Sequence, residues 1–281
     1  MLNTALVYDE IRLIKNNVLN IRTDSEELES VLKQFLKRES KVIRTIVSCL
    51  FFKALDEDID ENQIKILTAT EIVHNASLIH DDAIDGSLFR RGAETINYEY
   101  DNKLSVIAGD FLMSKAIDVL LQLGNNDILK LYFETISKMC EGESNQYFSR
   151  NQIPSIEDYL QKTKYKTAEL FKSCFVALAF YSKSQMIQEA REFAINFGIA
   201  FQIKNDLDDY RLGIENSSDV KEGVYTAPII FKNAVVNSNS AIEKTLELIR
   251  KYCDKTKLII ENFEESPYKT ELMRIIDNLC N

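Results

Sequence analysis

The sequence predicts an all-α fold, and three observations support this. Most segments carry apolar residues at the three- and four-residue spacing of amphipathic helices. The 281 residues include only 8 glycines and 3 prolines, too few turn-forming residues for a many-stranded β-protein. Hydrophobic residues make up 45% and charged residues 28%, an ordinary balance for a globular chain. No Pro-, Gly- or Ser-rich linker divides the sequence, so we expect residues 1–281 to form a single large helical domain.

Two long apolar stretches are predicted to be buried helices, at residues 64–80 and 185–210. Helix ends are expected where Gly, Asn or Pro gather, at 86–92, 124–126, 153–155 and 213–223. Ser155 is followed by two acidic residues and resembles a helix N-cap. Together these signals predict about ten or more helices.

Charge and composition exclude several classes of function. The chain has 34 Lys and Arg against 44 Asp and Glu, a net charge of -10, which disfavours nucleic acid as a partner. No apolar run approaches the roughly 18 residues of a transmembrane helix. Charges interrupt residues 1–20, unlike a signal peptide. The five scattered cysteines are expected to be reduced and mostly buried, as in a cytoplasmic protein.

Acidic clusters end both of the long apolar stretches. In the first, Asp81, Asp82 and Asp85 follow His80, and Asp81 and Asp85 share one helix face. In the second, Asn205 and Asp209 are likewise four residues apart. Like charges on one face of a helix C-terminus cost stability, so a cation should offset them. Each cluster alone could be a solvated helix end, but carboxylate pairs are the ligands that Mg²⁺ prefers.

Basic residues supply the opposite charge in small groups. They are Arg90 with Arg91, Lys41 with Arg44, and Lys164 with Lys166 and Thr167. The arginines can make bidentate phosphate contacts, and the three-residue spacing of Lys41 and Arg44 predicts a cation pair on one helix face. Each group alone would be surface decoration. Together with the carboxylates they suit a site that holds two phosphorylated groups, one through metal and one directly.

Six sequence blocks, in order, resemble the trans-prenyltransferases, the family of isoprenyl diphosphate synthases. The blocks are residues 71–85, 87–92, 102–112, Gly142-Glu143 with Gln146, 166–168 and 201–209, and residues 266–279 resemble the closing helix. The resemblance covers nearly the whole chain. It implies an all-helical, isoprenoid-synthase-like bundle around a central cavity, in which isopentenyl diphosphate condenses with an allylic diphosphate. It also implies Mg²⁺ as cofactor and a homodimer.

The resemblance also implies site residues. Asp81 and Asp85 would bind Mg²⁺ that bridges to the allylic diphosphate, with Asp82 in support, and Asn205 and Asp209 would hold the remaining metal across the cavity. Contacts to the allylic substrate would come from Arg90, Lys166, Thr167 and Gln202. The diphosphate of isopentenyl diphosphate would be held by Lys41, Arg44, His74 and Arg91. The catalytic set would be Asp81, Asp82, Asp85, Arg90 and Lys166, whereas His80 is expected to be structural.

Product length is expected to depend on Ala76 and Ser77, which lie one helical turn before Asp81. In the family a bulky aromatic residue at this level stops growth early. Ala76 would leave the channel open, so we expect a product of C20 or longer. A deeper residue would then form the floor: Val73, Leu112, Ala116 or Leu120. Alternatively, Ala76 only permits close helix packing.

The sequence departs from the family pattern at several positions. Asn205 replaces an aspartate, which predicts a raised Mg²⁺ requirement, and Val224 stands where the family has a phosphate-binding lysine, a role that Lys221 could take. Glu39 and Ser40 replace two glycines.

Three rival interpretations can be weighed on the sequence alone. A non-catalytic or weakly active partner subunit of a heteromeric synthase is the main one. A terpene cyclase is the second. Its metal motif would need Ser or Thr at position 209 and Glu at position 213, but this chain has Asp209 and Gly213. A purely structural acidic bundle would have no reason to place aspartates at the ends of its most apolar helices.

Overall fold

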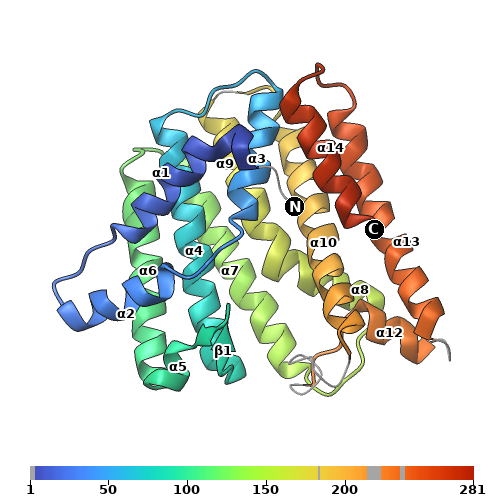
Figure 1. Cartoon of the computed structure of the whole chain (residues 1–281), viewed down its shortest axis with the longest axis horizontal. Coiled ribbons are helices and arrows are strands. Elements are labelled where there is room, and N and C mark those ends of the chain that lie inside the picture. The colour runs from blue at the N-terminus through green and yellow to red at the C-terminus, as the bar shows by residue number, and fades with distance from the viewer. Residues whose placement is uncertain (1–3, 183, 214–222, 235–237) are drawn as a thin grey trace. The chain divides into compact units, whose positions relative to one another are not determined.

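The computed structural model describes residues 4–182, 184–213, 223–234 and 238–281. Its Cα trace divides into two compact units, residues 3–130 and residues 131–281 with the first two residues. Each unit is built of helices, which confirms the predicted all-α class and the prediction of ten or more helices (Figure 1). None of the described helices has an apolar stretch long enough to cross a membrane.

Helices make up most of the first unit. They are η1 (Thr4–Val7), α1 (Tyr8–Leu19), α2 (Glu26–Leu36), α3 (Ile43–Ala54), α4 (Glu61–Asp85), α5 (Ile96–Glu99) and α6 (Asn102–Leu121). Helices α4 and α6 pack side by side, and α1 packs along α4 (Figure 1). This pairing buries the apolar residues of α4 and leaves the acidic end of the helix beside a short hairpin.

Helix α4 has strong signals at both ends. A capping box starts it, because the side chain of Asp60 accepts from the Gln63 backbone and the Gln63 side chain accepts from the Asp60 backbone. The helix stops at Gly86, whose φ of 65° is the left-handed conformation that glycine adopts without strain. The acidic cluster therefore occupies the last turn of α4, as the sequence predicted.

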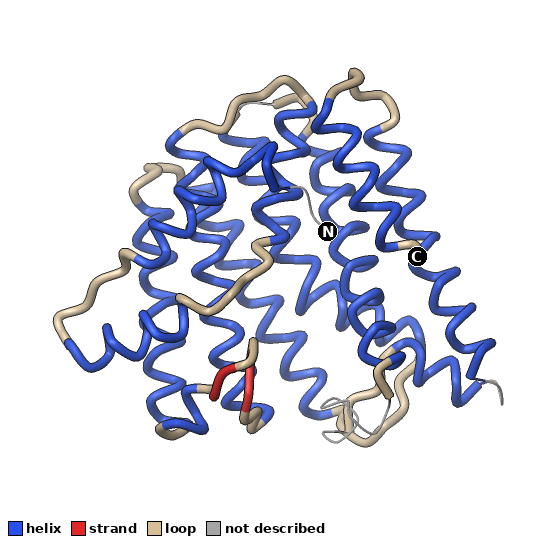
Figure 2. The backbone as a smooth tube through the Cα atoms, in the orientation of Figure 1, coloured by secondary structure: helices blue, strands red, loops and turns tan. Residues whose placement is uncertain are grey.

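A small β-hairpin follows α4 and was not predicted from the sequence. Strands β1 (Phe89–Arg90) and β2 (Ala93–Glu94) are antiparallel, with Arg90 opposite Ala93 (Figure 2). The two-residue turn between them is formed by Arg91 and Gly92, both with positive φ, at 54° and 75°. Two positive φ values are typical of the type I′ turn that suits the twist of a hairpin.

The second unit is also helical. Its elements are α7 (Asn126–Phe148), whose first turn belongs to the first unit, α8 (Ile156–Thr163), the π-helical turn η2 (Lys164–Ala168), α9 (Glu169–Tyr181), α10 (Ile187–Arg211), α12 (Ala227–Ala234), α13 (Ser238–Ile260) and α14 (Pro267–Leu279). Ser155 caps α8 by accepting from the Asp158 backbone, as predicted. Helix α10 packs against α9, α13 and η2.

Aromatic rings on α10 form the core of this unit. Phe193, Phe197 and Phe201 repeat every fourth residue, and their rings stack with centroids 5.9 Å and 6.3 Å apart. Phe171 of α9 meets two of these rings edge-on, at 5.6 Å and 6.0 Å. Such pairs add stabilisation beyond their buried area. The aromatic row therefore packs α10 against α9 in the turns that precede the polar C-terminal end of α10.

All five cysteines are free thiols, and Cys49, Cys174 and Cys253 are buried, as the sequence predicted.

Candidate active site

The acidic end of α4 separates its three aspartates into two roles. Asp81 and Asp85 lie one turn apart and are half-buried, whereas Asp82 is buried at 2% exposure. Asp82 accepts a hydrogen bond from Nε of Arg90 at 2.6 Å. Burial raises the pKa of Asp82, and the Arg90 charge opposes that rise. Asp82 therefore binds Arg90 of the hairpin. Asp81 and Asp85 form a separate pair of carboxylates, one turn apart at the same helix end.

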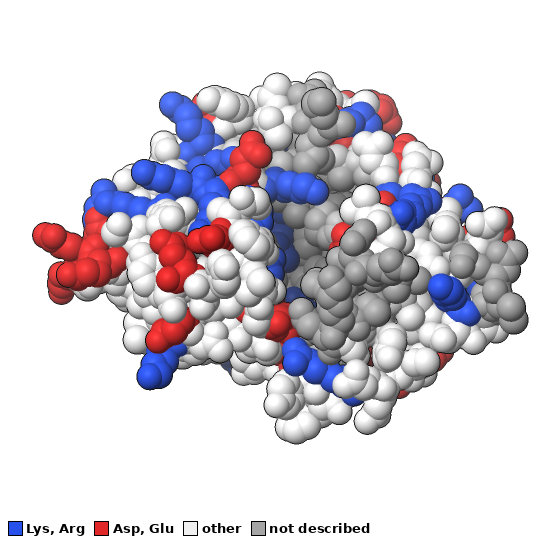
Figure 3. All heavy atoms as spheres, turned by 60° about the horizontal axis from the view of Figure 1, so that its bottom comes forward, with Lys and Arg blue, Asp and Glu red and all other residues white. Residues whose placement is uncertain are grey.

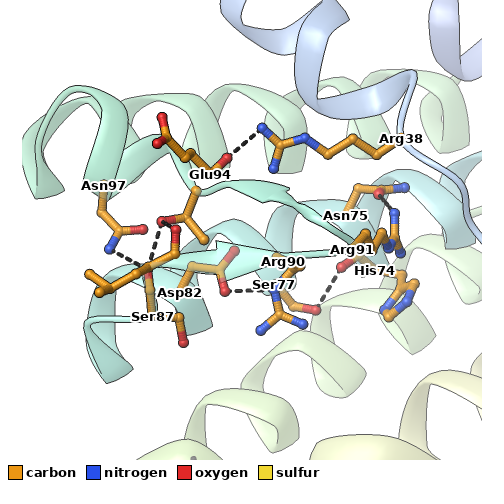
Figure 4. A network of polar contacts seen from close by, with 12 residues as sticks. Arg38, His74, Asn75, Ser77, Asp82, Ser87, Arg90, Arg91, Glu94 and Asn97 are labelled. Atoms are coloured by element: carbon orange, nitrogen blue, oxygen red, sulfur yellow. Dashed lines mark hydrogen bonds and ion pairs between the residues drawn. The ribbon is translucent and has the colours of Figure 1, made fainter.

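The hairpin presents two arginines through a strained turn. Arg91 adopts a left-handed φ of 54°, which costs a non-glycine residue about 1–3 kcal/mol. Its guanidinium lies 3.5 Å from Oδ1 of Asn75 on α4. From the segment after α2, Arg38 donates to the carbonyl of Glu94 at 2.6 Å. Figure 4 shows this network around the hairpin.

A buried carboxylate, Glu71, lies among the cations and was given no role by the sequence reasoning. It is 2% exposed and accepts a hydrogen bond from Oγ1 of Thr45 at 3.0 Å. Burial raises its pKa, and the nearby charge of Arg44 is the first interaction that lowers it. Arg44 itself is only 7% exposed. An acid inside an apolar helix was the signal that could have identified Glu71 as a counter-charge for Arg44.

His74 lies close to the arginines in the same region of α4, with its ring near the hairpin (Figure 4). Burial and the charges of Arg44, Arg91 and Arg90 lower the pKa of His74 well below its usual value. The imidazole is therefore neutral near pH 7 and can offer one N–H donor. The neutral ring therefore adds no positive charge to that of the surrounding guanidinium groups.

Lys41 and Arg44 do not share a helix face, contrary to the prediction. Helix α3 begins at Ile43, and Val42 before it has a left-handed φ of 41°. Lys41 therefore lies outside the helix and is exposed, whereas Arg44 is buried in the first turn. The three-residue spacing predicts a shared helix face, but the left-handed residue Val42 lies between the two cations and the helix begins only after it.

Ala76 and Ser77 lie on α4 before the aspartates. Ala76 is fully buried, and Ser77 donates to the carbonyl of His74 at 2.9 Å. The four deeper residues proposed as a floor are all buried on α4 or α6: Val73, Leu112, Ala116 and Leu120. His80 lies 3.3 Å from Asp110, and its ring occupies the space that a side chain at Gly109 would need.

In the second unit, η2 carries Lys166 and Thr167. Lys166 forms an ion pair of 2.5 Å with Glu143 of α7. The π-helical turn is enclosed by glycines on both sides: a Cβ at Gly142 would lie 2.9 Å from Tyr165, and one at Gly198 would lie 2.8 Å from Ala168. Single π-helical turns inside α-helices are frequent at functional sites.

The C-terminal end of α10 carries a connected polar row. Oγ1 of Thr167 donates to Oε1 of Gln202 at 3.0 Å, and Nε2 of Gln202 donates to Oδ1 of Asp206 at 2.7 Å. The hydroxyl of Tyr159 donates to Oδ2 of Asp206 at 2.6 Å. Asp206 is 6% exposed, and both of its carboxylate oxygens accept hydrogen bonds from protein side chains. Asn205 on the same helix end is half-buried and Asp209 is exposed.

Val224 is 7% exposed and belongs to the core of this unit. An apolar, buried residue offers no phosphate contact at that position. Lys221, the proposed substitute, lies outside the described residues.

Each of the two acidic helix ends offers a donor pair that fits a magnesium ion completed by substrate and water. Asp81 with Asp85, and Asn205 with Asp209, each offer two oxygen-bearing side chains one turn apart, and Mg²⁺ binds through one or two carboxylates plus phosphate oxygens and water. Over the described ranges, no group of three or more His, Cys, Asp or Glu side chains gathers to hold a metal unaided. Asp206 accepts from two protein donors, whereas within the described residues Asp82 accepts from Arg90 through Oδ1 alone.

Several residues of this site were missed by the sequence reasoning. They are Arg38, Glu71, Tyr159 and Asp206, with Glu143 named in a block but given no role. Each acts through a side-chain contact with a residue far away in the sequence, so spacing could not reveal it. On the visible surface, Lys and Arg lie beside Asp and Glu (Figure 3).

Comparisons with known proteins agree with this chemistry. Residues 25–264 match the family described as polyprenyl synthetase. The chain is 33% identical over 268 residues to a prenyl transferase of Cyanidium caldarium, covering 88% of this chain and 81% of that protein. It is 32% identical over 259 residues to a decaprenyl-diphosphate synthase of Dictyostelium discoideum, covering 81% of this chain and 57% of that protein.

A solved structure has the same fold. It is a polyprenyl synthase of Caulobacter crescentus complexed with calcium and isoprenyl diphosphate, with a TM-score of 0.89 and 23% identity, covering 99% of this chain and 96% of that one. The family match extends across both units and includes both acidic helix ends. The chain therefore belongs to the polyprenyl synthetase family.

Proposed function

We propose that this chain is a trans-polyprenyl diphosphate synthase that condenses isopentenyl diphosphate with an allylic diphosphate. The observation that carries the proposal is the arrangement around α4: an aspartate pair, an aspartate that holds Arg90, and a cluster of buried and half-buried cations. The relatives named prenyl transferase and decaprenyl-diphosphate synthase support it.

Arg90, Lys166, Thr167 and Gln202 are proposed to contact the allylic diphosphate. Departure of the diphosphate concentrates negative charge on its oxygens, and fixed cations and N–H donors stabilise that charge most when water is excluded. Asp82 fixes Arg90 in place for this task, and Glu143 does the same for Lys166.

Lys41, Arg44, His74 and Arg91 are proposed to hold the diphosphate of isopentenyl diphosphate. Arg44 is buried near Glu71, and its charge lowers the pKa of that carboxyl against the larger rise from burial. His74 is neutral and acts as a hydrogen-bond donor. Lys41 is exposed and supplies a flexible ammonium from outside the helix.

The reaction needs no protein nucleophile. The allylic C–O bond breaks and the diphosphate leaves with the electron pair. The double bond of isopentenyl diphosphate then attacks the allylic cation and forms the new C–C bond. The proton lost from the condensed cation passes to the departed diphosphate, which restores a double bond and balances charge.

Mg²⁺ is proposed as the metal, held by Asp81, Asp85, Asn205 and Asp209, and supported by the calcium bound in the Caulobacter structure. When bound, a divalent ion stabilises negative charge on phosphate oxygens as a Lewis acid.

A homodimer is proposed as well. Helix α6 exposes Val106 and Ile107, at 49% and 55% of their surface, and two neighbouring apolar side chains on one helix suit contact with a second copy. Light scattering on the purified chain should give twice the monomer mass, and a monomer at micromolar concentration would contradict the proposal.

The first experiment measures diphosphate release by the purified chain alone with Mg²⁺, isopentenyl diphosphate and an allylic primer. We expect release together with elongation, and no release would favour the alternative of a partner subunit. Asp81→Asn and Asp85→Asn should each reduce the rate by about 100-fold or more. Asp208→Asn is the control, because Asp208 is exposed and paired with Lys204 at 2.8 Å.

A further inference from the structure

We propose that Tyr159 and Asp206 are positioning residues that fix how Gln202 and Thr167 face the allylic diphosphate. This inference rests on the proposed function for the identity of that ligand. Both residues are buried, at 1% and 6% exposure, and neither was assigned a contact with substrate above.

The four side chains form one directed chain of hydrogen bonds. Thr167 donates to Gln202 at 3.0 Å, Gln202 donates to Asp206 at 2.7 Å, and Tyr159 donates to Asp206 at 2.6 Å. The two carboxylate oxygens of Asp206 accept from Tyr159 and from Gln202, so Asp206 sets the direction of the bonds along the chain. The amide of Gln202 must turn its nitrogen toward Asp206 and its oxygen toward Thr167.

This direction decides what the site can offer a ligand. The amide nitrogen of Gln202 carries two hydrogens, and only one is used on Asp206. The second is free to donate to a phosphate oxygen. The hydroxyl hydrogen of Thr167 is used on Gln202, so Thr167 donates to a ligand only if that bond opens. Gln202 is therefore the donor that the network prepares in advance.

Tyr159 fixes the Asp206 carboxylate on the side opposite to Gln202 in this chain of bonds. Asp206 lies four residues after Gln202 and three before Asp209 on α10, so these three side chains are neighbours on the helix surface. Hydrogen bonds to a charged group are the stronger kind, and the phenol secures one oxygen while Gln202 uses the other. Without the phenol, Asp206 can rotate toward water and release Gln202.

The network joins three elements of one unit. Tyr159 comes from α8, Thr167 from η2, and Gln202 with Asp206 from α10. Gly198 on α10 allows η2 to approach, because a Cβ there would lie 2.8 Å from the backbone of Ala168. The phenol therefore acts on the site from a separate helix, through Asp206.

The test compares Tyr159→Phe with Tyr181→Phe. The first removes the hydroxyl that donates to Asp206. The second removes a phenol at the far end of α9, about 20 Å along that helix from η2. We expect Tyr159→Phe to raise the KM for the allylic diphosphate by about tenfold, the loss of one charge-assisted hydrogen bond. The KM for isopentenyl diphosphate should change by less than about twofold, and Tyr181→Phe should change neither.

A double-mutant cycle separates positioning from general stability. If Tyr159 acts through Gln202, then in a Gln202→Leu background Tyr159→Phe should change the allylic KM by less than about twofold. A full effect in that background would overturn the inference. So would a Tyr159→Phe enzyme with a lowered Tm and unchanged KM values, because that is the signature of a structural role.

A binding measurement distinguishes failure of this inference from failure of the proposed function. Titration calorimetry with geranyl diphosphate and Mg²⁺ should show about tenfold weaker binding for Tyr159→Phe. A wild-type chain that binds but does not elongate would overturn the proposed function and leave the inference supported if the variant binds more weakly. Equal binding by variant and wild type would overturn the inference alone.

Discussion

His74 shows at the residue scale how burial changes chemistry. Burial and three arginines lower its pKa well below the usual value, so the folded chain holds it neutral where an unfolded chain would protonate it. Below the unfolded value of about 6.5, the unfolded state binds the extra proton. The free energy of unfolding therefore falls as the pH falls through that value.

Removing the imidazole should remove this pH dependence. Urea unfolding of His74→Gln and wild type at pH 7 and pH 5 tests it. We expect wild type to lose more stability than the variant between the two pH values. The same loss in both proteins would show that His74 is not depressed in the folded state.

Asn205 is a second residue whose type sets a measurable property. An amide oxygen is neutral, so the helix end formed with Asp209 carries one negative charge fewer than two carboxylates would. Asn205→Asp should lower the Mg²⁺ concentration for half-maximal activity by about tenfold, because ligand charge sets affinity for hard cations. Activity measured over a Mg²⁺ series checks this, and an unchanged requirement would contradict it.

At the scale of elements, helices were predictable and their irregular junctions were not. The spacing of apolar residues gave α4 and α10, and Gly86 marked the end of α4. The hairpin at Arg91 could not be predicted, because its turn has an arginine at a position where Asn or Gly is typical. The π-helical turn η2 escaped because its spacing differs from an α-helix by a single residue, and packing against two glycines decides it.

Close packing at η2 gives a stability prediction. A Cβ at Gly198 would meet the backbone of Ala168 at 2.8 Å, which cannot move aside without shifting η2. Overpacking of this kind costs about 1–3 kcal/mol. Gly109→Ala is the comparison variant, because the three atoms nearest to its Cβ all belong to the side chain of His80, which can rotate away where the backbone of Ala168 cannot.

Both variants gain the same helix propensity, so their difference isolates the clash. We expect Gly198→Ala to be less stable than Gly109→Ala by about 1 kcal/mol or more in urea unfolding. Equal stability of the two variants would mean that η2 adapts to the added methyl group.

At the scale of the whole molecule, the sequence was sufficient for the fold class and family and insufficient for the contacts. Short motifs located Asp81, Arg90 and Gln202, because their chemistry is local. The contacts of Glu71 and Tyr159 join residues far apart in the sequence, because Thr45 on α3 meets Glu71 on α4 and Tyr159 on α8 meets Asp206 on α10. The placement of Lys41 was wrong for the same reason, since one reversed backbone residue removed it from the helix.

Product length is a property of the whole fold. Ala76 is fully buried one turn before Asp81, and one turn of about 5.4 Å is comparable to one isoprene unit. Ala76→Tyr should therefore shorten the product by filling that level. Chromatography of the dephosphorylated products compares the two enzymes, and an unchanged product would show that Ala76 serves helix packing alone.

The most direct measurement is mass spectrometry of the product made by the purified chain from isopentenyl diphosphate, an allylic primer and Mg²⁺. Our account predicts a series of polyprenyl diphosphates that ends at C20 or longer. A product that stops at C15, or primer recovered only as its hydrolysed alcohol, would contradict it.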